Sequence, residues 1–184
     1  AGPVLQHCLS LLRGSTADES GLKVLDVAAG TGKLTELLAA VPWLDVHAAE
    51  PNPGMCTEFR DALPNVPLHQ APTQHLPFED SNLHTVFVAQ ALHWFDTQES
   101  LAEMARVLRP GAPLILIWNM EDGRVPWVRQ LRDLYEVYDT GIPQYRSGAW
   151  RDMFRSPLAS QLFSPAGVHT TCALQQETQT GPGR

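Results

Sequence analysis

The stretch KVLDVAAGTGKLT, residues 23–35, decides the fold of this chain. Its first five residues, 23–27, are mostly aliphatic and predict a short buried strand. Two glycines then interrupt the apolar run and indicate a turn. The following residues, 33–40, place three leucines on one face and predict an amphipathic helix. The three leucines are Leu34, Leu37 and Leu38. Strand, glycine turn and helix therefore follow one another directly.

Strand and helix signals continue to alternate on both sides of this stretch. Further strands are expected at residues 45–49, 67–71, 85–89 and 113–118, and helices at residues 4–12, from Asn52-Pro53 onward, and at residues 99–108. The last two strands are almost continuous runs of Val, Phe, Leu and Ile, which is typical of strands covered on both faces. The alternation predicts an α/β fold: a doubly wound, mostly parallel sheet with helices on both faces.

The pattern weakens after the last of these strands. Apolar residues between Trp127 and Tyr138 indicate one further helix, and residues 168–174 indicate one further strand. Residues 175–184 are polar and end in Gly-Pro-Gly-Arg, so we expect a disordered tail there. The chain is therefore expected to form a single domain at residues 1–174, followed by this tail.

Composition limits the class of protein. A chain of 184 residues fits about one domain, and a hydrophobic fraction of 43% is enough for a packed core. The net charge of −7 argues against binding to nucleic acids through clustered Lys and Arg. No apolar run approaches the roughly 20 residues that cross a bilayer, and residues 1–12 lack the basic start of a signal peptide. We expect a cytoplasmic protein with a small-molecule substrate and with no nucleic-acid or membrane partner.

Cysteine and histidine spacing argues against a metal site. Cys8, Cys56 and Cys172 are far apart and form no Cys-x-x-Cys pair, so neither a disulfide framework nor a zinc site is expected. The seven histidines include no His-Glu-x-x-His motif. The three thiols are expected to be buried or idle.

The glycine turn and Glu50 form the first candidate site. In a doubly wound sheet, a ligand binds outside the carboxyl ends of the strands, where the first strand-to-helix turn forms the floor of the crevice. Gly30 and Gly32 lack a Cβ, so backbone N–H groups can approach a ligand there. Glu50 ends the second strand, close to the offset of about 20 residues at which such folds place an acid on the ribose hydroxyls. Together, the glycine turn and Glu50 predict an adenosine-containing cofactor. Taken separately, the glycine turn also fits the start of a helix, and Glu50 also fits a solvated surface acid.

Two other nucleotide-binding motifs fit less well. A P-loop requires Gly-x-x-x-x-Gly-Lys followed by Ser or Thr, whereas Val27 stands at the first glycine and Leu34 follows Lys33. A dinucleotide fingerprint requires Gly or Ala at position 35, where this chain has the β-branched Thr35. The phosphate loop is excluded, and an NAD(P)-dependent oxidoreductase is disfavoured.

In the order of its motifs, the chain resembles the class I S-adenosylmethionine-dependent methyltransferases. Residues 24–35 carry the first motif. Three later segments also agree with the family pattern. They are Leu76-Pro77-Phe78 before the fourth strand, residues 89–95 (AQALHWF) after it, and Leu108-Arg109-Pro110-Gly111 before the fifth strand. The resemblance covers about residues 4–118. Within the class, the chain looks like the subgroup of trans-aconitate methyltransferase-like and other small-molecule enzymes.

The resemblance implies S-adenosylmethionine as the cofactor and assigns its parts to residues. Asp26 and the turn residues Ala28, Gly30, Thr31 and Gly32 would hold the methionine end. Glu50 would bind the ribose diol, with Pro51 and Asn52 on one side of the adenine and Thr73 and Gln74 at its edge. Gln90 and Ala91 would lie beneath the sulfonium, and His93 and Trp94 would face the substrate.

The chain departs from the family pattern in several places. Ala28 replaces the first glycine of the turn, which requires a negative φ there. Pro72 stands where many relatives have an acid for the adenine amino group. The resemblance implies about seven strands, the last two as an antiparallel hairpin, so we expect the chain to be truncated at both ends and its last strand to be missing. An exposed sheet edge would then favour self-association.

Methyl transfer to a small molecule, at a carboxylate or hydroxyl oxygen, is the function that the resemblance implies. The reaction needs alignment more than acid–base chemistry. His93 is a candidate for removing a hydroxyl proton or orienting a carboxylate, and the alternative is a structural histidine at a helix start. Trp94 is a candidate for stacking on the substrate or the sulfonium, and the alternative is core packing.

Two other functions stay open. A catalytically idle relative would use the fold to bind a partner, and an oxidoreductase would use a nicotinamide cofactor. Residues 121–165 carry no motif that identifies the acceptor. Trp118, Trp127 and Trp150 are candidates for the core or for the wall of a substrate pocket.

Overall fold

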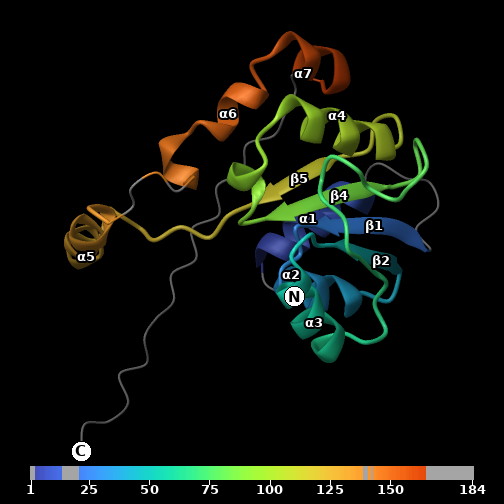
Figure 1. The fold of residues 1–184 in the computed structure, drawn as a ribbon, viewed down its shortest axis with the longest axis horizontal. Helices are drawn as coiled ribbons and strands as arrows, with labels where there is room; N and C mark the ends of the chain where they lie inside the picture. The colour runs from blue at the N-terminus through green and yellow to red at the C-terminus, as the bar shows by residue number, and fades with distance from the viewer. Residues whose placement is uncertain (1–2, 14–20, 139–140, 142, 165–184) are drawn as a thin grey trace, which may run out of the picture.

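The computed structural model describes residues 3–13, 21–138, 141 and 143–164, which form one parallel sheet with helices around it (Figure 1). The strand order is β3-β2-β1-β4-β5, and all four pairings are parallel. The strands are β1 (Leu22–Val27), β2 (Leu44–Ala49), β3 (Leu68–His69), β4 (Thr85–Ala89) and β5 (Leu114–Ile117). The chain runs outward from β1 to β3 and then returns to β4 on the other side of β1. The predicted doubly wound α/β fold is confirmed, and its switch point lies between β1 and β4.

Helices connect and cover the strands. They are α1 (Pro3–Arg13), α2 (Lys33–Ala39), α3 (Pro53–Ala62), α4 (Gln98–Val107), α5 (Pro126–Glu136), α6 (Trp150–Met153) and α7 (Pro157–Leu162), with short 3-10 helices η1 (Leu92–Trp94) and η2 (Tyr145–Ser147). The side chains of Asn52, Thr97 and Ser156 accept hydrogen bonds from backbone N–H groups in the first turns of α3, α4 and α7. These caps define where the three helices begin.

The core has one layer on each face of the sheet, because alternate strand residues point to opposite faces. On one face, α4 packs against β1 and β4 through Leu101, Met104 and Val107. On the other face, α1 and α2 cover a second layer. The strand residues of the first layer include Leu25, Val27, Val86 and Val88, and those of the second are Val24, Val46, Phe87 and Ile115. Packing on both faces holds the strand ends, and hence the loops that follow them, in fixed positions.

Most elements lie within one or two residues of their predicted bounds. The third strand has two residues, 68 and 69, where five were predicted at 67–71. Leu37 of α2 is 48% exposed, because Leu34 and Leu38, four residues apart, are the leucines that face the sheet. Cys8 and Cys56 are buried, as expected. The strand predicted at 168–174, the tail at 175–184 and Cys172 lie outside the described residues.

Helix α5 is present as predicted, but its apolar side is exposed. Figure 1 shows it apart from the sheet, on the side to which the β4 and β5 arrows point. Trp127, Leu131 and Leu134 recur at helical spacing, and no residue of α5 is buried. Trp127 is 67% exposed, so it does not belong to the core, one of its two predicted positions. Across the described residues, the helices are too short or too polar to span a bilayer.

Candidate cofactor site and acceptor pocket

The chain leaves the two central strands through left-handed residues. Ala28 follows β1 with φ 54°, and Gln90 follows β4 with φ 58°. The expectation of a negative φ at Ala28 is therefore wrong. A left-handed alanine costs about 1–2 kcal/mol, and the turn from β1 toward α2 imposes it. Because β1 and β4 are neighbours, the two strained residues lie at the switch point, where strain is typical of a functional site.

The two glycines of the turn, Gly30 and Gly32, have different surroundings. A Cβ on Gly32 would lie 2.7 Å from Leu63 Cδ1 and 3.0 Å from the Phe59 ring, so packing against α3 excludes any side chain there. A Cβ on Gly30 would meet only Met55 Sδ, at 3.9 Å. Both glycines have a positive φ, 60° at Gly30 and 88° at Gly32. Gly32 is therefore required by the fold, whereas Gly30 borders open space that a ligand can occupy.

Glu50 is fixed against this turn and is not a solvated surface acid. It follows β2 and is 4% exposed. Its Oε2 accepts a hydrogen bond from the Gly30 N–H at 2.9 Å, and its Oε1 accepts one from the Asn52 N–H at 2.9 Å. A carboxylate oxygen can accept more than one hydrogen bond, so both oxygens keep capacity for ligand hydroxyls. The predicted pairing of the glycine turn with Glu50 is a direct contact in the structure.

Asp26, in β1, is a second buried acid beside the turn, and one of its oxygens has no partner. Its Oδ2 accepts a hydrogen bond from Thr35 Oγ1 at 2.6 Å, while its buried Oδ1 accepts none in the described residues. Burial raises the pKa of Asp26 to about 7, and the Thr35 hydrogen bond opposes that rise. A ligand cation such as an ammonium group would supply both the missing donor and the missing charge. The residues present therefore fit the methionine end of S-adenosylmethionine.

The other predicted adenosine residues are less tightly joined to this group. Asn52 donates its backbone N–H to Glu50, but its side chain caps α3. Thr73 is buried and Gln74 is half-buried, and within the described part of the chain no hydrogen bond joins either of them to Glu50. Pro51 is exposed and Thr31 is half-buried. The roles of these residues toward an adenine stay predictions.

The segment after β4 is fixed to the end of β5. Gln90 donates its backbone N–H to Ile117 O at 2.8 Å and its side-chain amide to Asn119 O at 3.2 Å. Ala91 and Leu92 are buried, and His93 is half-buried. Trp94 is 61% exposed, so the core-packing alternative for this residue is wrong. Leu92 thus packs η1 against the core, while the side chains of His93 and Trp94 are open to other contacts.

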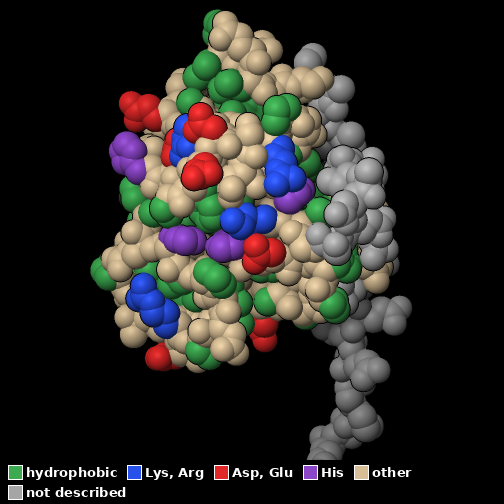
Figure 2. All heavy atoms as spheres, turned by 90° about the vertical axis from the view of Figure 1, so that its right-hand side faces the viewer, with side chains coloured by type: hydrophobic (Ala, Val, Ile, Leu, Met, Phe, Trp, Pro, Cys, Tyr) green, Lys and Arg blue, Asp and Glu red, His purple; other side chains and the backbone are tan. Residues whose placement is uncertain are grey.

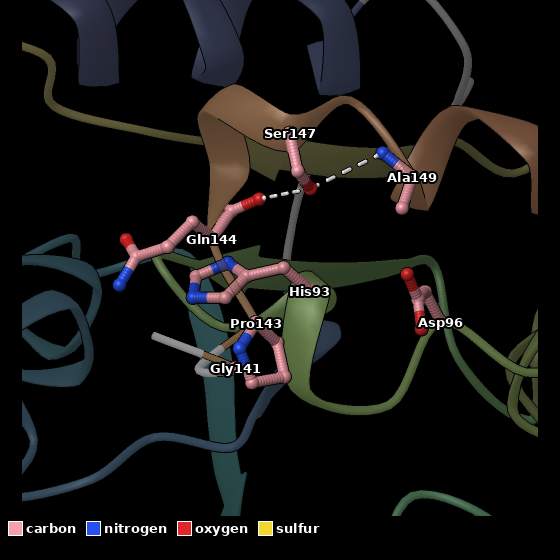
Figure 3. A pocket seen from close by; sticks show the side chains of 7 residues that line it. All are labelled: His93, Asp96, Gly141, Pro143, Gln144, Ser147 and Ala149. Atoms are coloured by element: carbon pink, nitrogen blue, oxygen red, sulfur yellow. Dashed lines mark hydrogen bonds between the residues drawn. The ribbon is translucent and has the colours of Figure 1, made fainter. Parts of the chain in front are cut away.

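A pocket of about 390 Å³ opens beside His93 (Figure 3). His93 and Asp96 come from the segment after β4, and the η2 region lies across from them. The remaining lining residues are Gly141, Pro143, Gln144, Ser147 and Ala149. Burial lowers the pKa of His93, and the nearby Asp96 opposes that change. The Nδ1 atom of His93 is buried without a hydrogen-bond partner in the described residues. The lowered pKa favours the neutral imidazole at pH 7, and whether His93 serves an acceptor or the fold stays a prediction.

Aromatic side chains stack behind the η2 region. Trp118 follows β5, and its ring centroid lies 4.6 Å from that of Trp150 and 4.8 Å from that of Tyr145. Trp150 is buried in the core and donates its Nε1–H to Tyr145 O at 3.0 Å. This places Trp150 in the core, one of its two predicted positions. Trp118 is half-buried, and its Nε1 lacks a partner in the described residues.

Unpartnered polar atoms gather at the carboxyl ends of three neighbouring strands. Four buried side-chain nitrogen or oxygen atoms in the described residues make no hydrogen bond. One is in β1 (Asp26 Oδ1), one follows β4 (His93 Nδ1), one follows β5 (Trp118 Nε1), and the fourth is Arg132 Nε in α5. Buried polar groups are normally satisfied, so each of these atoms is a candidate for a contact with a ligand.

One face of the molecule carries several histidine side chains (Figure 2), and two histidines of the sheet, in β2 and β3, form a pair. His47 of β2 and His69 of β3 have ring centroids 5.7 Å apart, and Nδ1 of His47 lies 3.4 Å from Nε2 of His69. Phe78 packs edge-on against both rings. Burial lowers the pKa of His69. In the part of the chain that the structure describes, no group of three or more His, Cys, Asp or Glu side chains is placed to hold a metal ion. We interpret the pair as packing.

Comparison with known proteins identifies the family. Residues 25–116, half of the chain, match the methyltransferase domain family. An uncharacterized methyltransferase of Mycobacterium tuberculosis is 45% identical over 112 residues, which cover 61% of this chain and 46% of that protein. A demethylmenaquinone methyltransferase of Chlorobaculum parvum is 32% identical over 117 residues, which cover 63% and 47% of the two proteins. The SAM-bound structure of an amino pentose methyltransferase from Micromonospora echinaspora is 26% identical, has a TM-score of 0.52, and covers 60% of this chain and 48% of its own.

The chain belongs to the methyltransferase domain family, within the class I S-adenosylmethionine-dependent methyltransferases. S-adenosylmethionine is the cofactor of this family. The chain spans about half the length of the curated relatives that it matches. Membership favours a methyltransferase over a nicotinamide-dependent oxidoreductase. The narrower likeness to trans-aconitate methyltransferases stays a prediction.

Proposed function

We propose that this chain binds S-adenosylmethionine at the switch point and transfers its methyl group to a small molecule in the pocket beside His93. The arrangement of two buried acids carries the proposal. Glu50 is held against the Gly30 N–H and can accept from a diol, and Asp26 keeps a buried oxygen for a cationic donor. S-adenosylmethionine has both a ribose diol and an ammonium group, so one ligand would satisfy both acids.

Each residue then has a separate task. Glu50 would accept hydrogen bonds from the ribose hydroxyls, and Asp26 Oδ1 would accept one from the ammonium group. Gly30 would let the ligand approach the backbone closely. When bound, the cofactor supplies a methyl group on a positively charged sulfur. The protein's contribution is to align that methyl group with a nucleophile, which accounts for the absence of a paired-carboxylate motif from the sequence.

His93 would serve the acceptor. It lies two residues after Ala91, on the segment that the family resemblance places beneath the sulfonium. A neutral imidazole can take a proton from a hydroxyl at its Nε2 or, in its other tautomer, donate to a carboxylate oxygen from the same nitrogen. A relative named for demethylmenaquinone supports a small organic molecule as acceptor. Both kinds of acceptor oxygen predicted from the sequence remain candidates at this point.

Partner binding without catalysis is a second candidate, and one observation favours it. Helix α5 exposes three large apolar side chains, Trp127, Leu131 and Leu134, and the two residues after the helix, Val137 and Tyr138, expose two more. Exposed apolar stripes of this kind are typical of contact surfaces. This candidate shares the fold and the cofactor site with the first, and differs from it in turnover.

Binding and turnover are measured separately. Calorimetric titration with S-adenosylhomocysteine, with NAD and NADP as controls, tests the cofactor. We expect binding, and an added stability of about 2.7 kcal/mol at about 100 times the dissociation constant. A melting temperature raised by NAD but unchanged by millimolar S-adenosylhomocysteine would overturn the proposal. Transfer of a labelled methyl group to a metabolite panel tests catalysis, and binding without any transfer would favour the second candidate.

A further inference from the structure

We infer that the methyl acceptor of this site is an uncharged hydroxyl compound, held between His93 and Asp96, and not a carboxylate. The inference rests on the proposed function and selects between the two acceptor oxygens that the family resemblance leaves open. Three observations support it: the charge of the pocket, the state of His93, and the chemistry that each acceptor requires.

Among the described residues that line the pocket, one side chain is acidic, and none is a lysine or an arginine. Among its lining residues, Asp96 is the one with a formal charge at pH 7, because His93 is neutral. The arginines nearest in sequence have other contacts. Arg146 Nε lies 3.3 Å from Glu136 Oε1, and the Arg151 guanidinium lies 4.4 Å from the Trp150 ring centroid. A carboxylate in this pocket would face Asp96 without a cation, which is an unfavourable way to remove a charge from water.

A hydroxyl acceptor gives both side chains a task. The hydroxyl proton passes to the neutral His93 imidazole at Nε2, the ring nitrogen other than the buried Nδ1, and the Asp96 carboxylate stabilises the imidazolium that forms. The oxygen lone pair forms the new bond to the methyl carbon, and the carbon–sulfur bond breaks with its electron pair left on sulfur. Charge and atoms balance, since the positive charge of the sulfonium ends on the imidazole. A carboxylate is already deprotonated at pH 7, so it would need neither the base nor the acid beside it.

The test compares three one-ring probes of similar size that differ in charge: phenol, benzoate and benzylamine. The ring C–H resonance of His93, assigned with His93→Gln, reports occupancy of this pocket by NMR at pH 7.5, with and without saturating S-adenosylhomocysteine. We expect phenol to shift the resonance at concentrations about tenfold lower than benzoate, as a like charge at close range would produce. Methyl transfer from the labelled cofactor should follow the same order.

Asp96→Asn is the decisive variant. Removing the charge should reduce the preference for phenol over benzoate by about tenfold, chiefly through tighter benzoate binding. Asp61→Asn is the matched control, because Asp61 is an exposed acid on α3 and its loss changes net charge equally. If Asp96→Asn does not fold, salt gives the same information in the wild-type protein, since screening should weaken the preference between 0.05 and about 0.5 M.

Several outcomes would overturn the inference. Benzoate binding as tightly as phenol would do so, and so would a preference for phenol over benzoate that survives Asp96→Asn. Asp96 attracts the benzylamine cation, so for this probe the deciding quantity is methyl transfer, and transfer faster than to phenol would overturn the inference. Loss of benzoate binding in Arg151→Ala would show that Arg151 serves the pocket as its cation. A His93 resonance that responds to no probe would remove the acceptor site altogether. Failure of S-adenosylhomocysteine to bind, by contrast, refutes the proposed function, and the probe titrations without it still report on the pocket.

Discussion

Asp26 and Glu50 are both buried near the carboxyl ends of neighbouring strands, β1 and β2, yet their surroundings differ. Glu50 receives two backbone N–H groups, whereas Asp26 receives one hydroxyl and keeps one oxygen without a partner. Thr35 supplies that hydroxyl. The same residue disfavours a dinucleotide site in the sequence, so its β-branched side chain has a positive role here: it holds an acid that a cationic ligand can complete.

The raised pKa of Asp26 leads to a pH-dependent prediction. The group titrates near 3.8 when unfolded and at about 7 in the fold, so its contribution to stability is complete below pH 3.8 and is lost as pH rises through 7. Asparagine does not ionise. Asp26→Asn should therefore stabilise the ligand-free protein by about 2 kcal/mol at pH 8 and weaken S-adenosylhomocysteine binding.

Urea unfolding at pH 4, 6 and 8 measures the stability effect, with Asp61→Asn as the surface control. The difference between Asp26→Asn and wild type should be near zero at pH 4 and grow toward pH 8. A difference that is the same at every pH would show that the carboxyl group is ionised throughout this range.

The two glycines of the turn allow packing and ligand contact to be separated. Gly32→Ala should destabilise the protein by about 3 kcal/mol, because its Cβ would meet Leu63 and Phe59 at a left-handed φ. Gly30→Ala should cost about 1 kcal/mol, for its left-handed φ alone. Its Cβ, however, borders the open space before the turn, so cofactor affinity should fall at least about tenfold, or 1.4 kcal/mol. Thermal melting and calorimetry on both variants test this, and the reverse pattern would contradict it.

At the level of helices and strands, the first half of the chain could be predicted from its sequence. Continuous apolar strands, the Gly30 turn and Glu50 lie close together along the chain, so local spacing is enough to find them. The left-handed Ala28 could not be found in this way, because the path from β1 to α2 sets its φ against the preference of the residue.

The acceptor pocket could not be predicted for a different reason. Asp96 is separated from Gln144 and Ser147 by about 50 residues, and tertiary contacts alone bring them together. The elements around the latter two are also short: η2 has three residues, α6 has four and α7 has six. Elements of one or two turns carry too little periodicity to be recognised. One weak signal for the pocket is present in the sequence: the acid Asp96 lies three residues after His93.

Helix α5 shows that a correctly predicted amphipathic helix need not pack its apolar side against the core. We expect the double variant Trp127→Gln, Leu134→Gln to change the free energy of unfolding by less than about 0.5 kcal/mol, because both side chains are exposed. Leu101→Ala in α4 is the contrasting control, since Leu101 is fully buried and its loss should cost about 2–5 kcal/mol. Urea unfolding measures both. A loss above about 1 kcal/mol in the double variant would mean that α5 is covered in solution.

In the molecule as a whole, paired and unpaired polar groups lie in different parts of the sheet. His47 of β2 pairs with His69 of β3, while Asp26 of β1, and His93 and Trp118 after β4 and β5, keep polar atoms without a partner in the described residues. The sheet core packs on both faces and supplies rigidity to both parts. The strained residues Ala28 and Gln90 follow β1 and β4, so strain and unpaired polar atoms occur together on the segments where the proposed ligand binds.

The open side of β5 supports a prediction about association. In the described residues β5 pairs with β4 alone, and backbone groups along a free strand edge tend to pair with another chain. We expect the protein to self-associate as its concentration rises, with the amides of residues 114–117 better protected from hydrogen exchange in concentrated than in dilute samples. Sedimentation velocity and exchange across one dilution series measure both quantities. The Trp127→Gln, Leu134→Gln variant identifies the surface: it should still associate if β5 makes the contact, and should be monomeric if α5 does. A monomer at every concentration, with β5 amides equally protected throughout, would show that this edge is closed within the chain itself.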